Sequence, residues 1–123
     1  MARIVIAEDV AEMRAALALV REGAGHTVEL APDGEAALAL HRGTPADLIV
    51  LDIWMPGTTG LQALKTLREA GDTVPVVIIS GGGPGRTLEN ATHLADLYGA
   101  ASVLYKPFED EELVAAVAAA LAV

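Results

Sequence analysis

The chain has 123 residues, which suits one domain with a real hydrophobic core. Its net charge of −9 argues against direct contact with nucleic acid, which needs a basic patch, and against binding to an anionic membrane surface. The absence of cysteine excludes disulfides and thiolate metal sites and fits a reducing compartment such as the cytoplasm. No apolar run approaches the roughly 18 residues of a membrane span, so none is expected.

Hydrophobic patterning predicts five short strands that alternate with five helices. Short aliphatic runs predict strands at residues 2–7, 27–31, 47–51, 74–79 and 102–105. Apolar residues that recur every three or four positions predict helices at residues 10–22, 35–42, 60–70, 88–98 and 110–121. The alternation predicts βαβ crossovers, and therefore an α/β fold whose parallel sheet is covered on both faces. With no linker or repeat, residues 1–123 are expected to form one domain.

Four of the five predicted strands end in polar or charged residues. Glu8 and Asp9 follow the first strand, Asp52 the third, Ser80 the fourth and Lys106 the fifth. Asp52 ends an unbroken aliphatic run of the kind that forms a strand buried on both faces, and a lone carboxylate is too costly to bury within such a run. Parallel strands end at one edge of their sheet, so these side chains are expected to converge there.

The chemistry of this set favours a magnesium ion and a phosphoryl group. Three carboxylates held together repel one another, and a divalent cation relieves the repulsion. Oxygen ligands without cysteine or histidine indicate a hard cation such as Mg²⁺. Lys106 adds a positive charge and Ser80 a hydrogen-bond donor, so Asp52 is predicted to act as a nucleophile that becomes an aspartyl phosphate.

Taken as a set, these residues resemble the receiver domain of two-component response regulators. The resemblance covers nearly the whole chain and rests on four segments in order: Glu8-Asp9, Asp52-Ile53-Trp54-Met55-Pro56 with Gly60, Ser80-Gly81 and Lys106-Pro107-Phe108. It implies a flavodoxin-like three-layer sandwich, (βα)5, with a five-stranded parallel sheet of order 2-1-3-4-5. It also implies phosphorelay signalling rather than an enzyme, apart from self-phosphorylation from a donor and self-dephosphorylation.

The resemblance further assigns a role to each site residue. Asp52 would accept the phosphoryl group from a histidine kinase or histidine phosphotransfer protein. Asp9, Asp52 and the backbone carbonyl of Trp54 would bind Mg²⁺, with Glu8 acting through water. Ser80 would move toward the phosphoryl group and switch the surface formed by the fourth helix, fifth strand and fifth helix, which an unknown downstream protein would recognise.

One position departs from the family pattern. Receivers usually carry a tyrosine or phenylalanine three residues before the lysine, and here that residue is Val103. Tyr105 lies one residue before Lys106, and strand alternation puts Val103 and Tyr105 on the same face. Either Tyr105 takes over part of the switch, or the switch is non-aromatic and Tyr105 only packs near the sheet edge.

Several alternatives stay open for the whole protein. The leading one is a stand-alone receiver, and the next is the receiver part of a longer regulator. A small Mg²⁺-dependent phosphatase with an aspartate nucleophile usually needs a second aspartate two residues on, where this chain has Trp54. A receiver that never takes phosphate conflicts with the complete residue set. The alanine-rich last helix is a candidate homodimer or partner surface, and His26, His41 and His93 are expected to be surface or packing residues.

Overall fold

The computed structural model describes residues 2–7, 25–52, 60–80, 99–105 and 108–122. The strands within these residues are β1 (Arg3–Ala7), β2 (Thr27–Ala31), β3 (Leu48–Asp52), β4 (Val76–Ser80) and β5 (Ser102–Tyr105). The helices are α2 (Gly34–Gly43), α3 (Gly60–Glu69) and α5 (Asp110–Leu121). The predicted helices at residues 10–22 and 88–98 lie outside the described residues.

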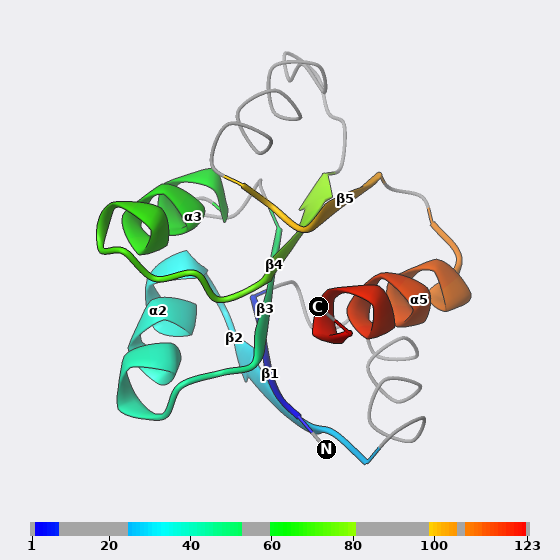
Figure 1. The fold of residues 1–123 in the computed structure, drawn as a ribbon, viewed down its shortest axis with the longest axis horizontal. Helices are drawn as coiled ribbons and strands as arrows, with labels where there is room; N and C mark the ends of the chain where they lie inside the picture. The colour runs from blue at the N-terminus through cyan, green and yellow to red at the C-terminus, as the bar shows by residue number, and fades with distance from the viewer. Residues whose placement is uncertain (1, 8–24, 53–59, 81–98, 106–107, 123) are drawn as a thin grey trace.

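The five strands form one parallel sheet in the order β2-β1-β3-β4-β5. Helices α2 and α3 cover one face of the sheet and α5 lies on the other (Figure 1). The predicted α/β fold and the strand order implied by the resemblance are therefore confirmed. Because this order places β3 in the centre, side chains on both faces of β3 are covered by helices.

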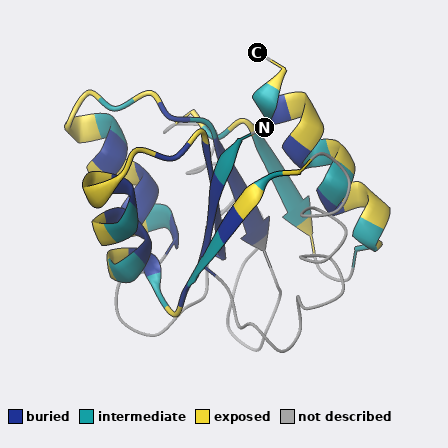
Figure 2. Ribbon diagram, turned by 90° about the horizontal axis from the view of Figure 1, so that it is seen from below, coloured by how far each residue is buried: buried dark blue, intermediate teal, exposed yellow. Residues whose placement is uncertain are grey.

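The aliphatic strands form the core because alternate side chains point to opposite faces of the sheet. In β3, Ile49 and Leu51 pack in the cluster beneath α2 and α3, whereas Leu48 and Val50 pack in the cluster beneath α5. All four are fully buried, and the central strands are dark blue along their length in Figure 2. A run with no polar position is therefore what a strand between two helical layers requires.

Each helix begins and packs as its sequence dictates. The Asp33 carboxylate caps α2 by accepting a hydrogen bond from the Ala36 backbone N–H at 2.8 Å. In α5 the buried residues are Leu113, Val117 and Ala120, spaced four and three apart on one face. None of the helices in the described ranges is long and apolar enough to cross a membrane.

Three predicted strands differ in their bounds from the observed ones, and in β1 the only difference is that the strand begins at Arg3 rather than Ala2. β4 begins at Val76 rather than Val74, because the Val74 N–H donates to the Asp72 carboxylate at 2.9 Å and Pro75 has no N–H to donate. β3 spans Leu48–Asp52 rather than 47–51, since Asp52 still pairs with β4. The difference in β3 matters for the site, because it makes Asp52 the last residue of the central strand.

Candidate functional site at the carboxyl edge of the sheet

Asp52 lies at the carboxyl end of β3, in register with Ile79 of β4. The residue is only 6% exposed although its side chain carries a carboxyl group. Among the described residues, only Asp52 and His41 are polar and buried. Burying a carboxylate costs free energy unless it is paired or hydrogen-bonded, and buried carboxylates gather at functional sites, so the burial of Asp52 is a functional indication. The sequence predicted the position at the strand end but not this degree of burial.

The neighbouring strands end at the same level of the sheet. Ala7, the last residue of β1, pairs with Leu51, and Ser80, the last residue of β4, pairs with Tyr105 at the end of β5. Asp52 therefore lies between the ends of β1 and β4, with the end of β5 beyond β4. The strand arrows in Figure 2 all point toward this edge.

The remaining predicted site residues lie outside the described part of the chain. Glu8 and Asp9 directly follow β1 in the sequence, Lys106 directly follows β5, and Trp54 follows Asp52 by two positions. Within the described ranges, no three histidine or acidic side chains are grouped to hold a metal ion. The makeup of the magnesium site thus stays a prediction, which the arrangement of the strand ends supports.

Val103 and Tyr105 occupy the strand next to Ser80. Val103 is half-buried and packs against the core cluster beneath α2 and α3, whereas Tyr105 is 43% exposed at the strand end. Ser80 and Tyr105 are backbone partners across β4 and β5. The ring that could replace the usual switch aromatic is therefore accessible, and both predicted forms of the switch remain open.

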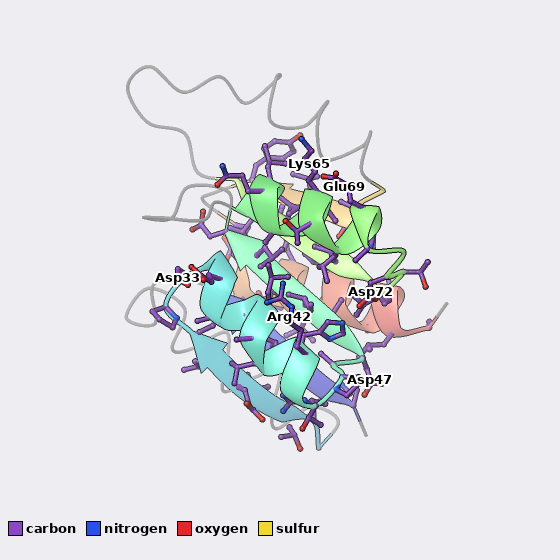
Figure 3. All side chains as sticks on the ribbon, turned by 90° about the vertical axis from the view of Figure 1, so that its left-hand side faces the viewer. Asp33, Arg42, Asp47, Lys65, Glu69 and Asp72 are labelled. Carbon is purple, nitrogen blue, oxygen red and sulfur yellow. The ribbon has the colours of Figure 1, made fainter. Side chains whose placement is uncertain are left out.

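A second polar group, which the sequence did not predict, lies at the opposite edge of the sheet. His41 Nε2 is 2.6 Å from Asp72 Oδ2, and both residues line a surface cavity of about 550 Å³ with residues 45–47 and 73–75. These segments precede β3 and β4, so the cavity lies at the amino edge. Figure 3 shows Asp47 and Asp72 near one end of α2, away from the α2 cap Asp33. His41 and Asp72 are 31 residues apart in the sequence, so no local sequence pattern predicts their contact.

Opposing effects act on the Asp72 carboxyl. Burial raises the pKa of Asp72, but the hydrogen bonds from His41 and the Val74 N–H, with the positive charge of Arg68, outweigh burial and hold it below its usual range. A carboxyl whose pKa falls on folding adds stability above its unfolded value of about 3.9. That contribution is lost as the pH falls through the lower, folded value.

Replacing Asp72 with Asn is expected to lower the free energy of unfolding by about 1 kcal/mol at pH 7, the net worth of a hydrogen bond. The difference from wild type should shrink as the pH falls below about 4, because wild type then loses the charged form. Urea unfolding of both proteins at several pH values measures this. The control is Glu69→Gln, a substitution at an exposed position on α3, which should change the free energy of unfolding by no more than about 0.5 kcal/mol at pH 7. A gap that does not shrink below about pH 4 would contradict the prediction.

The strand order 2-1-3-4-5, with helices on both faces, defines a flavodoxin-like doubly wound protein, a class that places its sites at the carboxyl edge of the sheet. Within this class the chain belongs to the response regulator receiver domain family, whose model matches residues 4–118. Membership in this family implies a part in phosphorelay signalling. Receiver domains generally bind Mg²⁺ and are not conventional enzymes.

Relatives and solved structures agree with this assignment. The alkaline phosphatase synthesis transcriptional regulatory protein SphR of Synechococcus elongatus is 36% identical over 92% of this chain and 46% of its own length. The response regulator MprA of Mycolicibacterium vanbaalenii is 35% identical over 97% of this chain and 50% of its own. The chain thus spans about half the length of the curated relatives it matches.

Among solved structures, the Francisella response regulator 1452 receiver domain has a TM-score of 0.82 and 29% identity, covering 99% of this chain and 98% of its own. The Vibrio cholerae chemotaxis protein CheY4 has a TM-score of 0.79 and 28% identity, covering 96% of this chain and 97% of its own. The flavodoxin-like fold inferred from the sequence is therefore that of solved receiver domains.

Proposed function

We propose that this chain receives a phosphoryl group on Asp52 from a histidine kinase or histidine phosphotransfer protein and relays the signal by changing its surface. The observation that carries the proposal is the place of Asp52. It is a buried carboxylate at the carboxyl end of the central strand, in a chain that belongs to the receiver family. Among the acidic residues of the described segments, only Asp52 is buried.

The chemistry follows from that position. A carboxylate oxygen of Asp52 attacks the phosphorus of a phosphohistidine, the P–N bond breaks, and the electron pair leaves with the imidazole, which takes a proton from solvent. The product is a mixed anhydride, aspartyl phosphate, which water later cleaves to inorganic phosphate and the free carboxylate. Since Asp52 is buried at the end of β3, a donor would have to approach its carboxylate from the carboxyl edge of the sheet.

Magnesium suits the donor atoms available at this edge. We assign Asp52, Asp9 and the Trp54 carbonyl as ligands, with Glu8 acting through water and Lys106 as the opposing cation. All the proposed ligand atoms are oxygens, which Mg²⁺ prefers, and the carboxylates supply the negative charge that attracts it. When bound, the ion would neutralise charge on the phosphoryl oxygens. The end of β1 beside β3 supports the assignment, since Glu8 and Asp9 follow it directly.

The signal would leave the site through β4 and β5. Ser80 ends β4 and is the strand partner of Tyr105, so a shift of Ser80 toward a phosphoryl group is transmitted directly to the end of β5. From there it would reach the surface formed by the fourth helix, β5 and α5. The half-buried Val103 has no ring to turn inward, which leaves Tyr105 or a non-aromatic backbone shift as the moving part.

The chain matches only about half the length of its curated relatives, which favours a second form of the same function. SphR is called a transcriptional regulatory protein, and this chain matches 46% of its length. A receiver that belongs to a longer regulator would control an output domain, whereas a stand-alone receiver would act through a separate protein or a homodimer on the alanine-rich α5. The intact mass of the native gene product distinguishes the two forms.

The proposed function is tested by incubating the chain with acetyl phosphate and Mg²⁺ and measuring its intact mass. We expect a gain of one phosphoryl group, and no gain when EDTA removes the metal. Dephosphorylation should restore the original mass. A chain that stays unmodified at high donor concentration, while a known receiver is labelled in parallel, would overturn the proposal.

A further inference from the structure

His41 joins two connections at the amino edge of the sheet. It lies in the last turn of α2 and is only 8% exposed. Its Nδ1 accepts a hydrogen bond from the Ala46 backbone N–H at 2.9 Å, in a buried setting. Its Nε2 lies 2.6 Å from Asp72 Oδ2. One imidazole thus links the connection that leads into β3 with the connection that leads into β4.

These two partners determine where the imidazole carries its proton. The backbone N–H of Ala46 can only donate, so Nδ1 must present a lone pair. The Asp72 carboxylate can only accept, so Nε2 must carry the hydrogen. The observed geometry therefore corresponds to the neutral Nε2–H tautomer. Both ring nitrogens are occupied, which leaves His41 no free nitrogen for a metal or a substrate.

We propose that His41 is a proton-operated latch, which in its neutral Nε2–H form ties the α2–β3 connection to the α3–β4 connection and on protonation at Nδ1 releases Ala46. A proton taken from solvent by Nδ1 would place two donors, Nδ1–H and the Ala46 N–H, against each other. The Asp72 bond would persist, because the imidazolium still donates from Nε2. The latch thus changes from a two-sided link to a one-sided one.

The charged groups near His41 come from several elements. Asp72 contacts the ring directly, Arg42 and Asp47 line the same cavity, and Arg68 donates to the Asp72 backbone carbonyl. Arg3, which is paired with Glu29, donates to the Leu40 and Thr44 carbonyls at the end of α2. Asp72 favours the imidazolium by direct contact, whereas the buried Ala46 N–H opposes it.

The released segment is short and well defined. The next residue, Asp47, keeps its own backbone bond to the Arg3 carbonyl at 2.8 Å, and its carboxylate accepts from the Arg3 N–H. Thr44 donates to the Leu40 carbonyl and closes α2. Protonation should therefore loosen Ala46 while the amide of Asp47 stays bonded to β1. This inference does not depend on the phosphoryl acceptor, since the latch lies at the opposite edge of the sheet.

The first test is ¹⁵N NMR of the His41 ring near pH 7.5. We expect Nε2 to carry a proton and Nδ1 to carry none, with Nδ1 accepting the hydrogen bond from the Ala46 amide. The opposite tautomer of the neutral ring would overturn the proposal. This measurement uses wild-type protein alone and stands even if variants fail to fold.

The second test is amide hydrogen exchange of Ala46, expressed as protection relative to the intrinsic rate, above and below the pH at which the ring titrates. Wild type should lose Ala46 protection at least tenfold when the ring is doubly protonated, while Asp47 stays protected. His41→Asn keeps an acceptor in the place of Nδ1 but cannot titrate, so its Ala46 protection should not change over this pH range. Equal Ala46 protection in both protonation states of wild type would refute the latch.

Discussion

Asp52→Asn should incorporate no phosphoryl group under conditions that label the wild type completely, as measured by intact mass after incubation with acetyl phosphate and Mg²⁺. The amide is nearly the same size as the carboxylate, so the buried position at the end of β3 remains filled. It lacks the anionic oxygen that must attack phosphorus, and with it one of the proposed ligands of Mg²⁺. The change therefore removes the chemistry and leaves the packing in place.

A matched control for this variant is Asp33→Asn. Asp33 also follows a strand at the carboxyl edge, two residues beyond the end of β2, but its carboxylate caps α2. Asparagine caps helices about as well as aspartate, so this variant should fold and take up a phosphoryl group like wild type. Labelling of Asp52→Asn to the wild-type level would show that another residue is the acceptor.

Leu113→Ala should lower the free energy of unfolding by about 2–5 kcal/mol, the usual cost of a large-to-small change in a packed core. Leu113 is fully buried and belongs to the cluster between α5 and the sheet. Only two other residues of α5, Val117 and Ala120, are buried, and both are smaller. Leu113 therefore supplies much of the apolar surface that holds α5 to the sheet, and the loss is measured by urea unfolding.

Val114→Ala is the control on the same helix. Val114 is half-buried at the margin of that cluster, so its truncation should cost clearly less than that of Leu113. The comparison also bears on signalling, since α5 is part of the surface proposed to switch. Equal effects of the two substitutions would mean that α5 is not anchored through Leu113.

The fold could be predicted because its central strands are uninterrupted aliphatic runs. An unbroken aliphatic run such as 48–51 has no polar position that either face could present to water, and so it predicts a central strand. β5 and α5 have the predicted bounds, Ser102–Tyr105 and Asp110–Leu121. The start of β4 was predicted two residues too early, since apolarity alone does not show that the Asp72 carboxylate takes the Val74 N–H.

The site was predictable only in part. Parallel strands bring their carboxyl ends to one edge, and this rule places Asp52, Ser80 and Tyr105 there without any knowledge of side-chain contacts. The link between His41 and Asp72 was not predictable, because it joins residues from separate connections and leaves no periodic trace. Long-range polar pairs depend on how the layers pack, which a single sequence does not specify.

The measurement that decides the matter is the chemical location of the phosphoryl group. Borohydride reduces an aspartyl phosphate to homoserine, so the phosphorylated chain can be treated, digested and sequenced by mass spectrometry. We expect homoserine at position 52 and unmodified aspartate elsewhere. Homoserine at Asp9, or a phosphoryl group that resists reduction and maps to a histidine or serine, would contradict the assignment of Asp52 as the acceptor.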